Sequence, residues 1–120
     1  MKIAIAGSRH YNDYEQAAKY IGMCLDNISA AEKHIIISGG CKGADAIGER
    51  FAKEKGYEIQ FFLAEWDKYG KAAGIVRNKK IAEAADIIIC FWDEKSKGTK
   101  SLIEYAKELK KTIFVYRISE

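Results

Sequence analysis

The chain has 120 residues, of which 48% are apolar, 12% aromatic and 31% charged, and its formal net charge is +3. This length and composition predict one domain with a substantial core over residues 1–120, and the weak positive charge neither requires nor excludes nucleic acid. The three cysteines are scattered along the sequence, so we expect free thiols and no metal site. No apolar run approaches the roughly 18 residues of a membrane span, and the first residues do not resemble a secretory leader. We therefore expect a cytoplasmic protein with no membrane contact and no cofactor.

Short apolar runs rich in β-branched residues alternate along the chain with apolar residues at helical spacing. Asn12 with Glu15 predicts a capping box that opens the first helix, and Gly56 predicts the end of the second. Continuous apolar strands are typical of parallel sheets covered on both faces, so we expect an α/β, Rossmann-like three-layer sandwich with a mainly parallel five-stranded sheet. The apolar runs that predict strands are 3–6, 35–37, 59–62, 87–91 and 113–116. The apolar residues at helical spacing fall within 17–28, 47–52, 81–85 and 102–109, and the second and fourth helices are expected to begin near Ala44 and at Gly98-Thr99.

Turns that contain glycine lie at three of the expected junctions between a strand and a helix. They are Gly7-Ser8-Arg9, residues 38–45 and Lys97-Gly98-Thr99. Ligands of open α/β sheets bind beyond the carboxyl ends of the strands, where backbone N–H groups and the positive ends of helix dipoles converge. The sequence therefore predicts a site for phosphate or another anion, although it has neither the dinucleotide-binding glycine pattern nor a Walker A loop.

Several side chains at these junctions have both a binding and a structural interpretation. Arg9 offers a planar cation for phosphate or carboxylate, or is an ordinary surface arginine. Asp45 and Glu49 share one helix face, so that Asp45 would accept ribose hydroxyls and Glu49 would polarise one, or both only complement the helix dipole. Trp92 at a strand end is suited to stack on a base or to cover the core.

Arg77 and Asn78, on the third expected helix, supply another cation and an amide, with a solvated Arg77 as the alternative. Thr99 is placed to cap the last helix and to contact a phosphate oxygen. The predicted ligand-binding residues are Gly7, Ser8, Arg9, Ser38, Gly39, Gly40, Gly43, Ala44, Asp45, Arg77, Asn78, Trp92, Asp93, Gly98 and Thr99.

The combination of these segments resembles the YspA-type branch of the SLOG superfamily over nearly the whole chain. The quoted residues that carry the resemblance are Gly7-Ser8-Arg9, Ser38-Gly39-Gly40, Gly43-Ala44-Asp45, Gly48-Glu49, residues 66–74, Arg77-Asn78, Ala85-Asp86, residues 91–93 and Lys97-Gly98-Thr99. The superfamily includes LOG phosphoribohydrolases and the DNA-processing DprA proteins. The resemblance implies a Rossmann-like fold and a nucleotide or nucleotide-derived ligand.

The departures from the LOG pattern bear on catalysis. Arg77 resembles the LOG arginine, but Leu102 stands three residues after Thr99, where the LOG loop carries a glutamate, and residues 94–96 replace its Pro-Gly-Gly. Loss of that carboxylate argues against LOG chemistry, because glycosidic cleavage needs a group that activates water or stabilises the oxocarbenium ion. The remaining catalytic candidates are Glu49, Arg77 and Asp93.

The leading hypothesis is a sensor or sequestering protein that binds a nucleotide-like small molecule. The alternatives are a nucleoside or nucleotide N-glycosidase and a DprA-like protein that binds single-stranded DNA, the last suggested by net positive charge and aromatic residues. A homodimer is also expected, because relatives in the superfamily pair through helices. The apolar stripe of Ile81, Ala82 and Ala85 would serve either as core or as interface.

Overall fold

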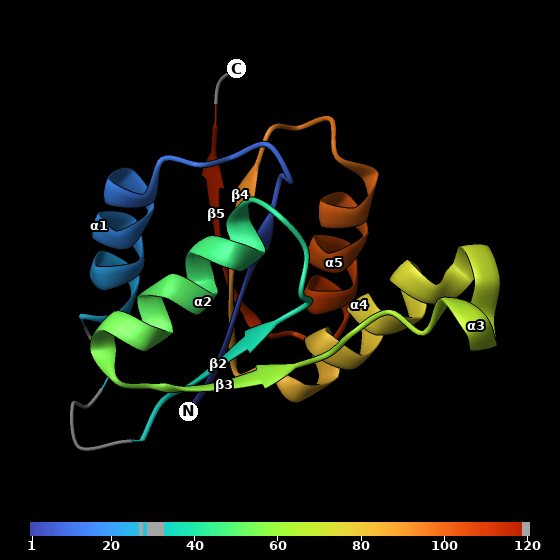
Figure 1. Cartoon of the computed structure of the whole chain (residues 1–120), viewed down its shortest axis with the longest axis horizontal. Helices are drawn as coiled ribbons and strands as arrows, with labels where there is room; N and C mark the ends of the chain where they lie inside the picture. Colours follow the sequence, from blue (N-terminus) through green and yellow to red (C-terminus); the bar gives the residue numbers. More distant parts are fainter. Residues whose placement is uncertain (27, 29–32, 119–120) are drawn as a thin grey trace.

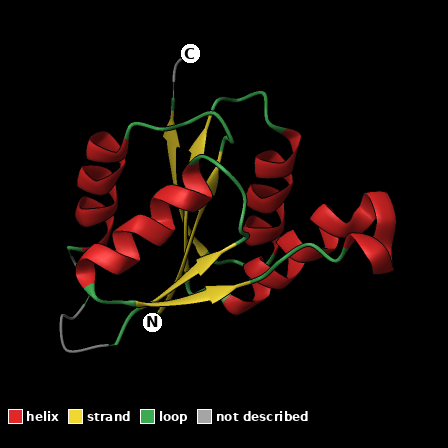
Figure 2. Cartoon of the chain, in the orientation of Figure 1, coloured by secondary structure: helices red, strands yellow, loops and turns green. Residues whose placement is uncertain are grey.

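The computed structural model describes residues 1–26, 28 and 33–118. A five-stranded sheet lies between two layers of helices, with the strands in the order β3-β2-β1-β4-β5 and every neighbouring pair parallel (Figures 1 and 2). The elements in chain order are β1 (Lys2–Gly7), α1 (Tyr14–Leu25), β2 (Ile35–Ser38), α2 (Ala44–Lys55), β3 (Glu58–Phe61), α3 (Trp66–Tyr69), the 3-10 turn η1 (Gly70–Ala72), α4 (Ala73–Ala84), β4 (Ile87–Trp92), α5 (Lys97–Glu108) and β5 (Thr112–Arg117).

Alternation along the central strands supplies both layers of the core. In β1, Ile3 and Ile5 pack toward α1 and α2, and Ala4 between them packs toward α4 and α5. Successive side chains of a strand point to opposite faces, so a strand covered on both sides must be apolar throughout. The α/β sandwich with a parallel five-stranded sheet is therefore confirmed.

Three local predictions differ from the structure. The cap of α1 is Asp13, whose side chain accepts the N–H of Gln16, so the capping box at Asn12 is wrong by one residue. Helix α1 ends at Leu25 rather than continuing to Ile28. The short α3 and η1 turns before α4 were not expected, because few apolar residues there show a helical period.

Other expectations about the helices have clear outcomes. Gly56 ends α2 in the left-handed conformation, as predicted. Ile81, Ala82 and Ala85 are buried in the core between the sheet, α4 and α5, which removes this stripe as a candidate for a dimer interface. Within the described ranges, no helix is long and apolar enough to cross a membrane.

The strand order places the switch point of the sheet between β1 and β4. From β1 the chain proceeds through α1 to β2 on one side, and from β4 it proceeds through α5 to β5 on the other. The two connections leave in opposite directions, so a crevice opens beyond the carboxyl ends of these two strands. Any ligand site of this fold is expected there.

Candidate functional site

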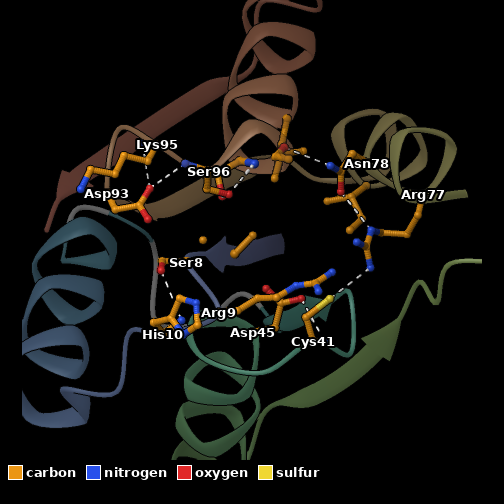
Figure 3. Close-up of a pocket in the computed structure, with 16 residues that line it drawn as sticks. Ser8, Arg9, His10, Cys41, Asp45, Arg77, Asn78, Asp93, Lys95 and Ser96 are labelled. Carbon is orange, nitrogen blue, oxygen red and sulfur yellow. Dashed lines mark hydrogen bonds between the residues drawn. The ribbon is translucent and has the colours of Figure 1, made fainter. Parts of the chain in front are cut away.

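A cavity of about 350 Å³ lies beyond the carboxyl ends of β1 and β4 (Figure 3). Four segments that are distant in sequence form its walls: the turn after β1, the start of α2 with its preceding loop, α4, and the turn that leads into α5. We call this cavity the switch-point pocket. Its lining residues are Ala6, Gly7, Ser8, Arg9, His10, Cys41, Asp45, Arg77, Asn78, Ile81, Asp93, Lys95, Ser96, Gly98, Thr99 and Leu102.

The turn after β1 is held between β4 and α2. The N–H of Ser8 donates to the carbonyl of Phe91 at 2.9 Å, and the Ser8 carbonyl accepts the N–H of Ala44, the first residue of α2, at 3.1 Å. Gly7 has a φ of 149°, and a Cβ at this position would lie 2.1 Å from the Phe91 carbonyl oxygen. Only glycine permits so close an approach, which lets the turn lie against β4.

Arg77 and Asn78 connect opposite walls of the pocket. The Arg77 guanidinium donates through Nη1 to the Gly39 carbonyl at 2.8 Å and through Nε to Oδ1 of Asn78 at 2.9 Å. The Asn78 amide nitrogen in turn donates to the Gly98 carbonyl at 3.1 Å. This chain of hydrogen bonds joins the loop after β2 to the first turn of α5, and it fixes the orientation of the guanidinium plane.

Asp45 is a buried carboxylate beside that guanidinium. Its side chain accepts the N–H of Cys41 at 3.2 Å, and a Cβ on Gly39 would lie 2.8 Å from its Oδ2 and 2.6 Å from Arg77 Nη1. Burial raises the pKa of the Asp45 carboxyl above its ordinary value, while the Cys41 N–H and the Arg77 charge act in the opposite direction. The pocket therefore holds a carboxyl group whose ionised form is poorly solvated.

The turn between β4 and α5 forms an ordered rim. Oδ1 of Asp93 accepts the N–H groups of Ser96 at 2.7 Å and of Lys95 at 2.9 Å, and these bonds lower the pKa of Asp93. Ser96 caps α5 by accepting the N–H of Thr99, and the two hydroxyls lie 3.1 Å apart. The first N–H groups of the twelve-residue helix α5 lack intrahelical acceptors, so its positive end faces the pocket through Gly98 and Thr99.

Nine of the predicted ligand-binding residues line the switch-point pocket: Gly7, Ser8, Arg9, Asp45, Arg77, Asn78, Asp93, Gly98 and Thr99. Gly39 and Gly40 line an adjoining cavity instead, and Gly43 and Ala44 form the start of α2 behind the wall. Ser38 is buried, and its hydroxyl donates to the Glu49 carboxylate at 2.7 Å, so neither residue lines the pocket.

Trp92 also lies outside the pocket wall. Its indole N–H donates to the Ser96 carbonyl at 3.1 Å, and its ring packs against the core between the sheet, α4 and α5. Strand alternation explains this placement, because Trp92 follows Phe91, which faces α1 and α2. The structure thus gives Trp92 the role of covering the core.

Several lining residues were missed by the sequence analysis, namely Ala6, His10, Cys41, Ile81, Lys95, Ser96 and Leu102. Ser96 carried a usable signal, since a serine three residues before Thr99 is a favoured helix cap. His10 directly follows the predicted turn and could have been included with it. In the described part of the chain, no group of three His, Cys, Asp or Glu side chains is placed to hold a metal ion.

A doubly wound parallel sheet with a polar pocket at its switch point places the protein among the Rossmann-like α/β folds. A model of the YspA, cpYpsA-related SLOG family matches residues 1–69, and the chain belongs to this family.

Two further similarities concern individual proteins. The chain is 31% identical over 80 residues to the Gene 61 protein of Mycobacterium phage D29, covering 62% of this chain and 64% of the phage protein. Its fold is similar to that of DNA processing protein A (DprA) from Streptococcus pneumoniae, with a TM-score of 0.73 and 21% identity, over 95% of this chain and 49% of that one. The matched part of the chain thus spans 64% of the length of the phage protein and 49% of the length of DprA.

Proposed function

We propose that this protein binds a small phosphate-bearing ligand of the nucleotide type in the switch-point pocket. The observation that carries the proposal is the convergence of the α5 N-terminus, Arg9 and Arg77 on one cavity of about 350 Å³. A helix N-terminus and guanidinium groups are the donors that phosphate prefers in proteins, and the volume falls in the range of small-molecule sites.

The other polar groups of the pocket suit the sugar of a nucleotide. Asp45 offers carboxylate oxygens beside the Arg77 guanidinium, and the hydroxyls of Ser8 and Thr99 can both donate and accept. Membership of the SLOG family supports the same ligand class. We therefore assign the phosphate to the side of Gly98 and Thr99 and the hydroxyl-bearing sugar to the side of Asp45.

Binding is favoured over N-glycosidic hydrolysis by the placement of the carboxylates. Leu102 supplies a buried apolar wall at the position where the LOG pattern carries a glutamate. Glu49 lies outside the pocket, and Asp93 is engaged by two backbone N–H groups, which keep it ionised and hold it in the turn. A hydrolase at this site would therefore have to use Asp45 or Asp93, the carboxylates that line the pocket, in place of the missing glutamate.

The proposal is tested by incubating the protein with nucleoside monophosphates, ADP-ribose, NAD and cyclic nucleotides, followed by ultrafiltration and mass analysis of both fractions. We expect a compound that is retained intact and released on denaturation, and we expect the matching nucleoside without phosphate to pass through. Free base or ribose phosphate in the filtrate would instead identify a hydrolase. Retention of no member of the panel would refute nucleotide binding.

A substitution of Arg9 tests whether the ligand binds in the switch-point pocket. Arg9 is exposed at the pocket rim, and in Figure 3 its side chain extends toward Arg77. Arg9→Ala should weaken binding about 10- to 100-fold, because a hydrogen bond to a charged group contributes about 1.5–3 kcal/mol. Arg50→Ala, which removes an exposed arginine of α2 outside the pocket, is the matched control. Equal affinities of the two variants would place the ligand elsewhere.

A further inference from the structure

A second cavity, of about 690 Å³, adjoins the switch-point pocket and shares Arg9, His10, Cys41 and Arg77 with it. Its outer part is formed by the loop after β2 and by the segment between β3 and α3. We call it the outer cavity. The residues that line it but not the switch-point pocket are Gly39, Gly40, Lys42, Leu63, Ala64 and Trp66.

Two of the exposed large apolar side chains in the described part of the chain line the outer cavity. Trp66, the first residue of α3, is 57% exposed, and Leu63 is 62% exposed. A large aromatic side chain left in water forgoes the free energy of burial, and apolar surface beside a polar pocket marks a place where a ligand or partner is bound. Figure 1 shows α3 at the edge of the molecule, beyond α4.

Leu63 in the wall of the outer cavity packs against the loop after β2. Gly40 has a φ of 76°, and a Cβ there would lie 2.5 Å from Cδ2 of Leu63, so the missing side chain lets Leu63 lie against the loop. The carbonyl of the neighbouring Gly39 accepts the Arg77 guanidinium at 2.8 Å. The apolar rim and the cationic pocket are therefore joined through one short loop.

We propose that the outer cavity binds the planar base of the ligand, with Trp66 as its stacking surface and Arg9 and Arg77 between base and phosphate. The inference rests on the proposed nucleotide function. Aromatic side chains bind bases through their π-faces with little dependence on base identity. Trp92 lines neither cavity, and its ring packs against the core.

The two compartments match the two chemical parts of such a ligand. Phosphate needs the helix N-terminus and the cations of the switch-point pocket, whereas a base needs an apolar plane with polar groups at its edge. Trp66 supplies the plane, and Lys42 lines the same cavity as a polar side chain beside it. A ligand that has phosphate and sugar but no base should therefore bind only the inner compartment.

The experiment compares Trp66→Ala with the parent protein in calorimetric titrations of AMP, GMP, CMP, UMP, ADP-ribose and ribose 5-phosphate. We expect the affinity for the bound nucleotides to fall about 10- to 100-fold, the range that loss of one base–aromatic stack produces, while ribose 5-phosphate changes by less than about twofold. Trp66→Phe should retain most of the affinity. Ile75→Ala, which shortens another exposed apolar side chain (49% exposed) on α4, is the matched control.

Fluorescence gives an independent measurement, since the chain contains two tryptophans. In Trp92→Phe the emission comes from Trp66 alone, and a bound nucleotide should quench it while ribose 5-phosphate does not. Undiminished nucleotide binding by Trp66→Ala would overturn the inference and leave the proposed function standing. An equal loss for nucleotide and ribose 5-phosphate would also overturn it, and binding of no phosphate compound would refute both.

Discussion

Replacing Asn78 with alanine removes the bridge between α4 and α5 at the pocket. The Asn78 side chain is 9% exposed, and both ends of its amide are used, accepting from Arg77 Nε at 2.9 Å and donating to the Gly98 carbonyl at 3.1 Å. Each bond contributes about 0.5–1.5 kcal/mol, so the expected loss in the free energy of unfolding is about 2 kcal/mol. For a domain of this size, that loss lowers Tm by about 8 °C.

The assay is urea and thermal unfolding of Asn78→Ala beside Asn12→Ala, which removes an exposed asparagine in the loop before α1. The control should stay within about 0.5 kcal/mol of the parent protein, as surface substitutions usually do. Nucleotide affinity should fall with Asn78→Ala as well, because the Arg77 guanidinium loses the partner that orients it. An unfolding free energy for Asn78→Ala equal to that of the control would show that the bridge does not form in solution.

Two further predictions concern the stability of the fold: a pair of glycine substitutions should change it in opposite directions, and a substitution of Asp45 should change it in a way that depends on pH. Gly7→Ala should destabilise the fold by more than about 3 kcal/mol, because its Cβ would lie 2.1 Å from the Phe91 carbonyl oxygen. Gly22 lies in the interior of α1, and a Cβ there would have nothing within 4 Å. In the same denaturation assay, Gly22→Ala should therefore stabilise the fold by about 0.5–1 kcal/mol. Equal losses for both would contradict the steric reason. Asp45→Asn should raise Tm at pH 7, because burial raises the pKa of the carboxyl above 3.8, so that the unfolded chain ionises more readily and the charge opposes folding. The Tm difference between Asp45→Asn and the parent protein should shrink as the pH falls from 7 toward 3.8, because the unfolded chain then also keeps this carboxyl protonated. A Tm difference that grows between pH 7 and pH 4 would refute the raised pKa of Asp45.

The sheet was predictable because both of its faces are covered. Strand β4 is apolar throughout, and burial on two faces demands such a run, so its position could be predicted without any contact information. The location of the pocket follows from the same reasoning, since parallel strands bring their carboxyl ends to one edge. This explains why the turns at Gly7 and Gly98, which the sequence places at the same edge of the sheet, line one cavity.

The side-chain partners could not be predicted. Arg77 contacts Gly39 across 38 positions of sequence, and no local pattern distinguishes that arginine from a solvated one. The sequence left Trp92 open between stacking on a base and covering the core, and its packing against the core follows from the alternation of its strand. The cap of α1 was misplaced because Asn12 and Asp13 are both good capping residues and only the chain path selects between them.

The distribution of buried polar groups favours ligand binding over a purely structural origin of the pocket. Among the described residues, the buried polar or charged ones are Ser8, His34, Ser38, Asp45, Asn78 and Thr99, and all of these except His34 and Ser38 line the switch-point pocket. Burying a polar group costs free energy unless hydrogen bonds compensate it, as they do for Asn78, so the argument rests on the groups that are compensated incompletely. Asp45 is the clearest case, because the direction of its pKa shift shows that the folded state disfavours its charge. A ligand whose donors compensate that charge would bind more tightly to this carboxylate than to a solvated one, and this is the physical reason for the role that we propose for Asp45.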